Sequence, residues 1–213
     1  MIGLSVFVKL SGKRGMMRNP LILDILQPLL NKPYFTSKEA RALGITIAAL
    51  HHYIKKGTIK RIRRGVYQSS ICENQTFQWR DLIEAVLSVS GGAVCLISAL
   101  AIYELTEEMP RQHWIAVNNS TSIKRNREIK FTRLRNMNLG VTKIVLEGVS
   151  VPIFDRERTI IDSFRLLSRE TAIKALKMGV SQKGTKKIDL LKLQEYAEKL
   201  RVDITDFLMM VTT

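Results

Sequence analysis

The apolar positions between residues 34 and 56 recur at the spacing of two short helices separated by a tight turn. Thr36 and Glu39 stand three residues apart, which is the spacing of a capping box at the start of the first helix. Gly44 suits the left-handed conformation that ends a helix, and Thr46 can cap the second helix two residues later. The pattern therefore predicts two helices joined by the short connection of a helix-turn-helix unit.

The second of these helices is predicted over residues 46–56. Its 3.6-residue period gathers Ile47, Leu50 and Ile54 on one face, with Tyr53 at the edge, and we expect this face to pack against neighbouring helices. The opposite face is small and basic, so we expect it to enter the major groove of DNA. The residues predicted to present this surface are Thr46, Ala48, Ala49, His52, Lys55 and Lys56.

A basic hairpin is predicted directly after Gly57. Two short strands, over residues 58–62 and 66–68, flank a turn in which Gly65 permits a positive φ. An earlier apolar pattern predicts a helix over residues 20–30, which completes a three-helix core. Three helices followed by a hairpin predict a winged helix-turn-helix domain, in which the hairpin is the wing.

Positive charge is concentrated on the same helix and hairpin. The chain contains 34 Lys and Arg against 19 Asp and Glu, which gives a formal net charge of +15. A run of cations without acids is either a solvated face or a surface for a polyanion. This run lies on the helix and hairpin that a winged helix presents to DNA, so its position favours a DNA-binding surface over a solvated face. Such a surface gains binding free energy because each neutralised phosphate releases counterions. The cations predicted to contact DNA are Lys55, Lys56, Lys60, Arg61, Arg63 and Arg64.

The length of 213 residues exceeds one domain of roughly 100–150 residues, so we predict two domains. Residues 18–70 are predicted to form the winged helix-turn-helix domain. Residues 76–213 are predicted to form an α+β domain that ends in a helical tail. Residues 1–17 are interpreted as a non-native or disordered extension, because Met16 and Met17 offer a later start of translation.

The second domain is predicted to consist of a small sheet against helices. The run over residues 93–105 is almost wholly apolar and too long for a strand, so it predicts a buried central helix. Asp155, Ser168, Asp189 and Asp203 are predicted to cap the helices that follow the sheet. Strands are predicted over residues 114–117, 129–132, 141–146 and 149–154.

A second basic cluster runs along the strand predicted over residues 129–132 and the loop that precedes it. It is interpreted either as an extension of the DNA-binding surface past the wing or as a charged edge that protects the sheet from aggregation. Its members are Lys124, Arg125, Arg127, Lys130, Arg133 and Arg135.

An enzyme is the competing functional class. Glu128 and Lys130 flank one residue on a predicted strand, a spacing that metal-dependent nucleases use to hold Mg²⁺ and polarise water. The preceding predicted strand carries no acid that could be a second metal ligand. No catalytic residue, metal site or cofactor is therefore predicted. The third class is a non-catalytic adaptor that binds proteins.

Cysteine usage and hydropathy indicate the compartment. Cys72 and Cys95 are isolated in a chain long enough to build its own core, so neither a disulfide scaffold nor a metal cluster is predicted. No apolar run approaches the length of a membrane span, and the first residues lack the features of a signal peptide. We therefore predict a cytoplasmic protein without a membrane partner.

Five segments together resemble the AbiEi family of antitoxins and transcriptional regulators from bacterial abortive-infection, type IV toxin-antitoxin systems. The resemblance extends from residue 20 onward and implies that the winged helix binds inverted repeats of double-stranded operator DNA. It further implies that the second domain serves antitoxicity against a nucleotidyltransferase-like toxin, without a stable complex being required. The segments are FTSKEARALGIT, GTIKRIRRGVY, CLISALAIYELT, WIAV and VPIFDRERTIIDSFR.

The acidic and basic residues of the last segment are interpreted as structural. Asp155 precedes a predicted helix as its cap, and Arg158 and Asp162 stand four residues apart on one helix face. We therefore predict an ion pair between these two side chains, without a catalytic role.

Overall fold

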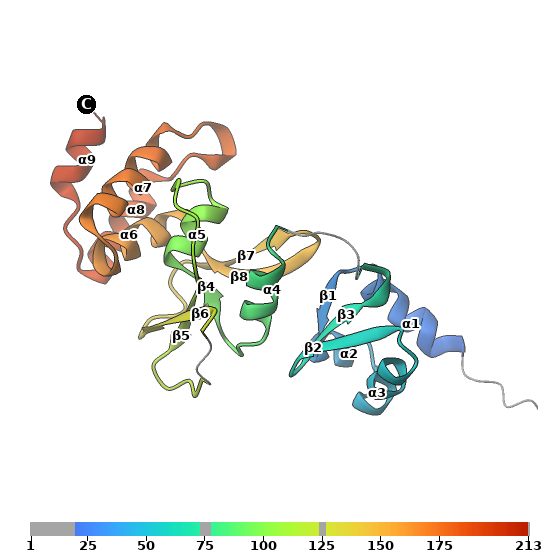
Figure 1. The fold of residues 1–213 in the computed structure, drawn as a ribbon. Coiled ribbons are helices and arrows are strands. Elements are labelled where there is room, and N and C mark those ends of the chain that lie inside the picture. Colours follow the sequence, from blue (N-terminus) through green and yellow to red (C-terminus); the bar gives the residue numbers. More distant parts are fainter. Residues whose placement is uncertain (1–19, 73–77, 124–126, 213) are drawn as a thin grey trace, which may run out of the picture.

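The computed structural model describes residues 20–72, 78–123 and 127–212. Figure 1 shows two groups of elements, which we call the N-terminal part (residues 20–72) and the C-terminal part (residues 78–212). Each contains helices and a sheet, so the protein has mixed α and β structure. The predicted extension over residues 1–17 lies outside the described residues.

The N-terminal part contains a three-stranded antiparallel sheet in the order β1-β3-β2. Helix α1 has the predicted bounds, whereas β1 was not predicted from the sequence. The sequence pattern there showed only the start of the following helix. The elements are α1 (Pro20–Leu30), β1 (Tyr34–Thr36), α2 (Ser37–Ala42), α3 (Ile47–Lys55), β2 (Ile59–Arg63) and β3 (Val66–Ser69), followed by the short 3-10 helix η1 (Ser70–Cys72).

Local hydrogen bonds fix the ends of α2 and α3 as the sequence predicts. Thr36 Oγ1 accepts from the Glu39 amide at 3.2 Å, and the Glu39 carboxylate accepts from the Thr36 amide at 2.7 Å, which completes the capping box. Gly44 has φ +78°, the left-handed conformation that turns the chain after α2. Thr46 Oγ1 then accepts from the Ala49 amide at 3.2 Å and caps α3.

The N-terminal part has a core of its own. Ile47 was predicted to belong to it but is 54% exposed, and Ile25 of α1 also lies at the surface. Ile47 is the first residue of α3, and the helix contacts the core one turn further along, at Leu50 and Tyr53. The buried residues of this core are Leu26, Leu29, Leu30, Phe35, Ala40, Ile45, Leu50, Tyr53, Ile59 and Tyr67.

The C-terminal part contains a five-stranded mixed sheet in the order β6-β5-β4-β8-β7. Strand β4 pairs antiparallel with β5 and parallel with β8, and thereby joins the two halves of the sheet. The strands are β4 (Ala93–Val94), β5 (His113–Asn118), β6 (Ile129–Leu134), β7 (Val141–Leu146) and β8 (Val149–Phe154). The helices are α4 (Arg80–Leu87), α5 (Leu96–Ile102), α6 (Arg156–Leu166), α7 (Arg169–Ser181), η2 (Gly184–Lys186), α8 (Leu190–Leu200) and α9 (Thr205–Thr212).

The predicted single helix over residues 93–105 is wrong at its start. Ala93 and Val94 form the central strand β4, and α5 begins only at Leu96. The uniform apolar run arises because β4 is buried on both faces: Val94 packs in the larger core and Ala93 in a smaller one. A central strand and a buried helix give the same pattern, so periodicity could not separate them.

Helix α6 follows β8 directly and carries the predicted ion pair. Asp155 Oδ1 accepts from the Arg158 amide at 2.8 Å and caps the helix. Arg158 Nε donates to Asp162 Oδ2 at 2.7 Å, and both side chains are 1% exposed. Arg158 also donates to the carbonyls of Leu139 and Asn136. These bonds satisfy a charge that would otherwise be costly to bury.

Polar side chains connect the N-terminal part to α4. Tyr34 Oη in β1 donates to Glu84 Oε1 at 2.9 Å, and Arg80 donates to Glu84 Oε1 and to Gln68 Oε1 in β3. Burial, followed by the hydrogen bond to Glu84, raises the pKa of Tyr34 far above its usual value, so the hydroxyl remains a donor. Tyr34 and Val66 also pack in the larger core with residues of the C-terminal part.

Candidate nucleic-acid interface

Helix α3 presents a continuous exposed face. Ala48, His52 and Lys55 recur at helical spacing on this face, and all three are exposed. Thr46 and Lys56 are exposed at the two ends of the helix. The His52 ring lies edge-on to the Tyr53 ring, with 5.4 Å between centroids, so a buried neighbour holds one side of the imidazole. Small residues near the start and cations near the end agree with the predicted surface.

The structure corrects two positions on this face. Ala49 was predicted on the exposed side, but it is half-buried and packs against the core of the N-terminal part. Ile47 and His51 are exposed in its place, and neither was predicted to face a partner. The sequence could have predicted the exposure of His51, because it lies three residues after Ala48 and four after Ile47, on the same helix face.

The hairpin of β2 and β3 is attached to the start of α2 at its turn. The Ser37 amide donates to the Gly65 carbonyl at 2.8 Å. Gly65 has φ +78°, and a Cβ at this position would lie 3.2 Å from Ser37 Oγ. The backbone conformation therefore favours glycine at the tip, and a Cβ there would also have to displace the Ser37 hydroxyl by a few tenths of an ångström. The hairpin has a defined orientation relative to α2.

Exposed cations follow one another along β2 and into the turn of this hairpin. Lys60, Arg61 and Arg64 are exposed, and Arg63 pairs with Val66 across the strands. The side chain of Arg63 lies outside the described part of the structure. The register shifts between Arg61 and Arg63, which is the mark of a bulge and increases the local twist.

The segment that carries these cations contains no acid of its own. The sequence contains no Asp or Glu between Glu39 and Glu73. Glu39 itself is occupied: its carboxylate accepts from the Thr36 amide and pairs with Lys32 at 3.2 Å. The exposed face of α3 and the hairpin, which follow one another in the chain, therefore present a basic surface in a segment that contains no acid of its own. We call this surface the α3–hairpin surface.

The second basic cluster does not form one surface among the described residues. Lys124 and Arg125 lie outside them, and Arg127 is exposed before β6. Lys130 and Arg133 project from opposite faces of β6, because they stand three positions apart and side chains alternate along a strand. Lys130 Nζ lies 3.9 Å from the centroid of the Trp114 ring, a cation–π contact within the protein. Arg135 follows the strand at the side of Arg133 and is exposed.

The nuclease alternative requires a metal site, and the part of the chain that the structure describes contains none. No group of three or more His, Cys, Asp or Glu there is placed to hold a metal ion. Lys130, which the alternative needed beside Glu128, contacts Trp114. Cys95 is buried in the C-terminal part, and this burial raises the pKa of its thiol far above the usual value. It therefore lacks the thiolate character of a nucleophile.

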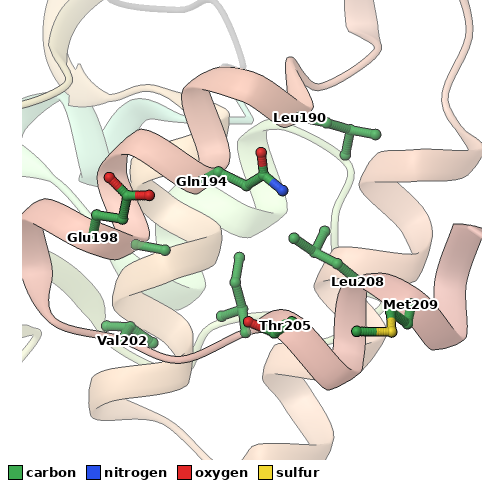
Figure 2. Close-up of a pocket in the computed structure, with 9 residues that line it drawn as sticks. Leu190, Gln194, Glu198, Val202, Thr205, Leu208 and Met209 are labelled. Atoms are coloured by element: carbon green, nitrogen blue, oxygen red, sulfur yellow. The ribbon is translucent and has the colours of Figure 1, made fainter.

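A hollow of about 490 Å³ lies between α8 and α9 (Figure 2). Leu190 and Gln194 line it from α8, while Leu208 and Met209 line it from α9. Among its described lining residues, Glu198 is the only ionisable one. The hollow therefore lacks the convergent polar groups of a catalytic site. In the described residues, no helix is long and apolar enough to cross a membrane.

Comparison with known proteins identifies the segment that carries the α3–hairpin surface. Residues 25–70 match the model of a protein family described as transcriptional regulator, AbiEi antitoxin. The matched residues include α2, α3 and both strands of the hairpin. The resemblance predicted from the sequence is thus confirmed over this segment. No curated protein matches the chain.

Proposed function

We propose that the protein is a DNA-binding transcriptional regulator whose N-terminal part is a winged helix-turn-helix domain. The α3–hairpin surface carries the proposal, because it combines a slim exposed helix face with a basic hairpin in a segment whose sequence is rich in Lys and Arg. In this arrangement α2 and α3 form the helix-turn-helix, and the hairpin of β2 and β3 is the wing. The family match over residues 25–70 supports the same assignment.

The two halves of the surface have different tasks on DNA. The first turns of α3 are narrow enough, at Ala48 and His52, to approach base edges in a major groove about 12 Å wide. Lys55 and Lys56 end the helix, so they fall beside the phosphate backbone. Arg61 and Arg64 on the wing contact phosphates or the adjacent minor groove, where they position the domain.

The regulator acts in the cytoplasm as an autorepressor and antitoxin. We propose that it binds inverted repeats in its own promoter and represses an operon that also encodes a toxin. Residues 18–70 are the DNA-binding domain in this proposal, and residues 76–213 are the domain that counters the toxin. The support for both roles is the family match, together with the separate core of the N-terminal part. No catalytic step is assigned to either domain.

A salt titration tests the proposal directly. The full-length protein is titrated with duplex DNA from upstream of its own gene, and with a random duplex of equal length, between 50 and 300 mM salt. If about five phosphates are neutralised, the logarithm of the association constant should fall with log salt at a slope of roughly −4 to −5. A slope near zero on both duplexes would contradict DNA binding. Equal affinity for both duplexes at every salt concentration would contradict operator recognition.

The antitoxin role needs a separate readout. Cells that express the toxin encoded beside this gene are grown with and without the full-length protein, and the protein should restore growth. The toxin is expressed from an unrelated promoter, so that repression of the operon cannot account for rescue. Failure to rescue at matched protein levels would leave DNA regulation intact but overturn the antitoxin assignment.

A further inference from the structure

A cleft of about 460 Å³ lies in the C-terminal part where three elements end close together. Arg133 and Arg135 line it from the end of β6, Arg165 from the last turn of α6, and Lys199 and Arg201 from the end of α8. The described lining residues include no Asp or Glu. Several cations therefore converge on one concave volume from three separate elements.

Some of these cations are occupied by groups of the protein itself. Arg165 Nη1 donates to Asp162 Oδ1 at 2.6 Å, and this buried carboxylate also holds Arg158. Arg133 Nη1 donates to the carbonyls of Asn119 and Thr121, which fix the guanidinium without changing its charge. Lys199 pairs with Glu195. The net charge of the cleft stays positive after these pairs.

Arg135 and Arg201 are the cations that remain. Both are exposed, and neither makes an ion pair with a carboxylate in the described part of the chain. Arg201 stands at the end of α8 in the left-handed conformation, with φ +57°, which is unusual for a residue with a Cβ. A neutral donor stands beside them. Asn136 Oδ1 accepts from the amides of Asn138 and Leu139, so its NH₂ group is left to donate.

We propose that this cleft binds the phosphate groups of a small oligophosphate, such as the diphosphate of a nucleotide. Guanidinium groups match phosphate oxygens with two parallel hydrogen bonds, and Arg135 and Arg201 supply two such groups. The volume falls in the usual range of small-molecule sites, roughly 300–1,000 Å³. Asn136 adds a neutral donor to the phosphate oxygens.

A compact anion fits this geometry better than duplex DNA. A duplex presents its phosphates along a convex surface, so it is matched by cations spread along a ridge or a helix. Here the cations converge on a concave volume, where a single group with several oxygens can contact all of them. The cleft also lies in the C-terminal part, on α6 and α8, whereas α3 belongs to the N-terminal part (Figure 1). The proposed site is therefore distinct from the α3–hairpin surface.

The test uses isothermal titration of the full-length protein with inorganic pyrophosphate, with orthophosphate as the simpler anion. The cleft variant is Arg135→Gln with Arg201→Gln. The matched control is Lys143→Gln with Lys187→Gln, which removes the same charge from exposed positions outside the cleft. We expect pyrophosphate to bind the parent and the control with equal affinity. Its affinity for the cleft variant should be lower by at least about tenfold.

Two further measurements make the result decisive. Arg201 ends α8, so Arg135→Gln alone is titrated as well, and thermal unfolding is recorded for every variant. Equal pyrophosphate binding by the single variant, the double variant and the control would overturn the proposal. Duplex DNA binding is measured on the same set. Loss of duplex affinity in the cleft variant, with no pyrophosphate binding by the parent, would show that the cleft belongs to a DNA surface and that the proposal is wrong.

Discussion

Single residues of the α3–hairpin surface have separable effects in the proposed function. Arg61→Ala with Arg64→Ala should weaken binding to operator and random DNA alike and reduce the salt slope by about 2, because each lost phosphate contact removes roughly 0.9. His52→Ala should instead reduce the preference for the operator by about 1 kcal/mol, since base contacts specify sequence. Binding titrations on both duplexes measure these effects, with Lys143→Ala as the control. Equal loss of preference in both variants would contradict this division.

Glu39 should couple stability of the N-terminal part to pH. Burial alone would raise its pKa, but hydrogen bonds from Thr36 and Lys32 outweigh this effect and hold the pKa below its ordinary value of 4.5. The carboxylate therefore stabilises the folded state above about pH 4.5, and this contribution is lost as pH falls through the lower, folded pKa. Melting temperatures measured from pH 3 to 7 should fall less steeply in Glu39→Gln than in the parent. Parallel curves would show that the carboxylate gives no such coupling.

At the scale of elements, α6 depends on one buried ion pair. Arg158→Met leaves Asp162 buried with only Arg165 as a partner, so we expect a loss of about 3–5 kcal/mol in the free energy of unfolding. Urea denaturation measures this loss. Arg158→Met with Asp162→Leu should recover part of it, because the unpaired charge is then absent. A loss below about 1 kcal/mol in the single variant would mean that water solvates Asp162 after all.

The elements that the sequence predicted well are those whose signals are local. Thr36, Thr46 and Asp155 cap helices because a side-chain oxygen reaches an amide two or three residues away, and that spacing is visible in the sequence. The two shortest strands were missed. Tyr34–Thr36 and Ala93–Val94 are strands only because distant segments pair with them, and no pattern of two or three residues encodes a remote partner.

The candidate site shows the same limit. The cations of the hairpin and the cap of α3 were predicted because they follow from composition and spacing. Ile47 and Ala49 were assigned to the wrong faces, because the core of the N-terminal part contacts Ala49 and leaves Ile47, the first residue of α3, exposed. Helical periodicity gives the direction of a side chain, but the extent of the neighbouring core decides whether anything covers it. The cleft beside Arg135 was not predicted, since it needs three elements far apart in the chain.

At the scale of the whole molecule, the two parts share an interface although each has its own core. Gln68 is fully buried in the N-terminal part and accepts from Arg80 of α4, while Tyr34 donates to Glu84. Val66 packs with the larger core beside Tyr34. The α3–hairpin surface therefore connects to the C-terminal part through β1 and β3, and a change in α4 can alter the stability of the hairpin of β2 and β3.

The two proposed functions should be separable by cutting the chain between the two parts, before α4. A fragment of residues 18–70 keeps the core of the N-terminal part, but it loses α4 and exposes Tyr34 and Val66. A chain of about sixty residues buries only about 60% of its surface, so the fragment should fold with less stability than the parent. We expect it to bind an operator half-site weakly and to fail to rescue cells from the toxin. Circular dichroism, gel shift and the growth assay measure the three properties. Full rescue by the fragment would show that antitoxicity depends on DNA binding, and the assignment of the C-terminal part would then be wrong.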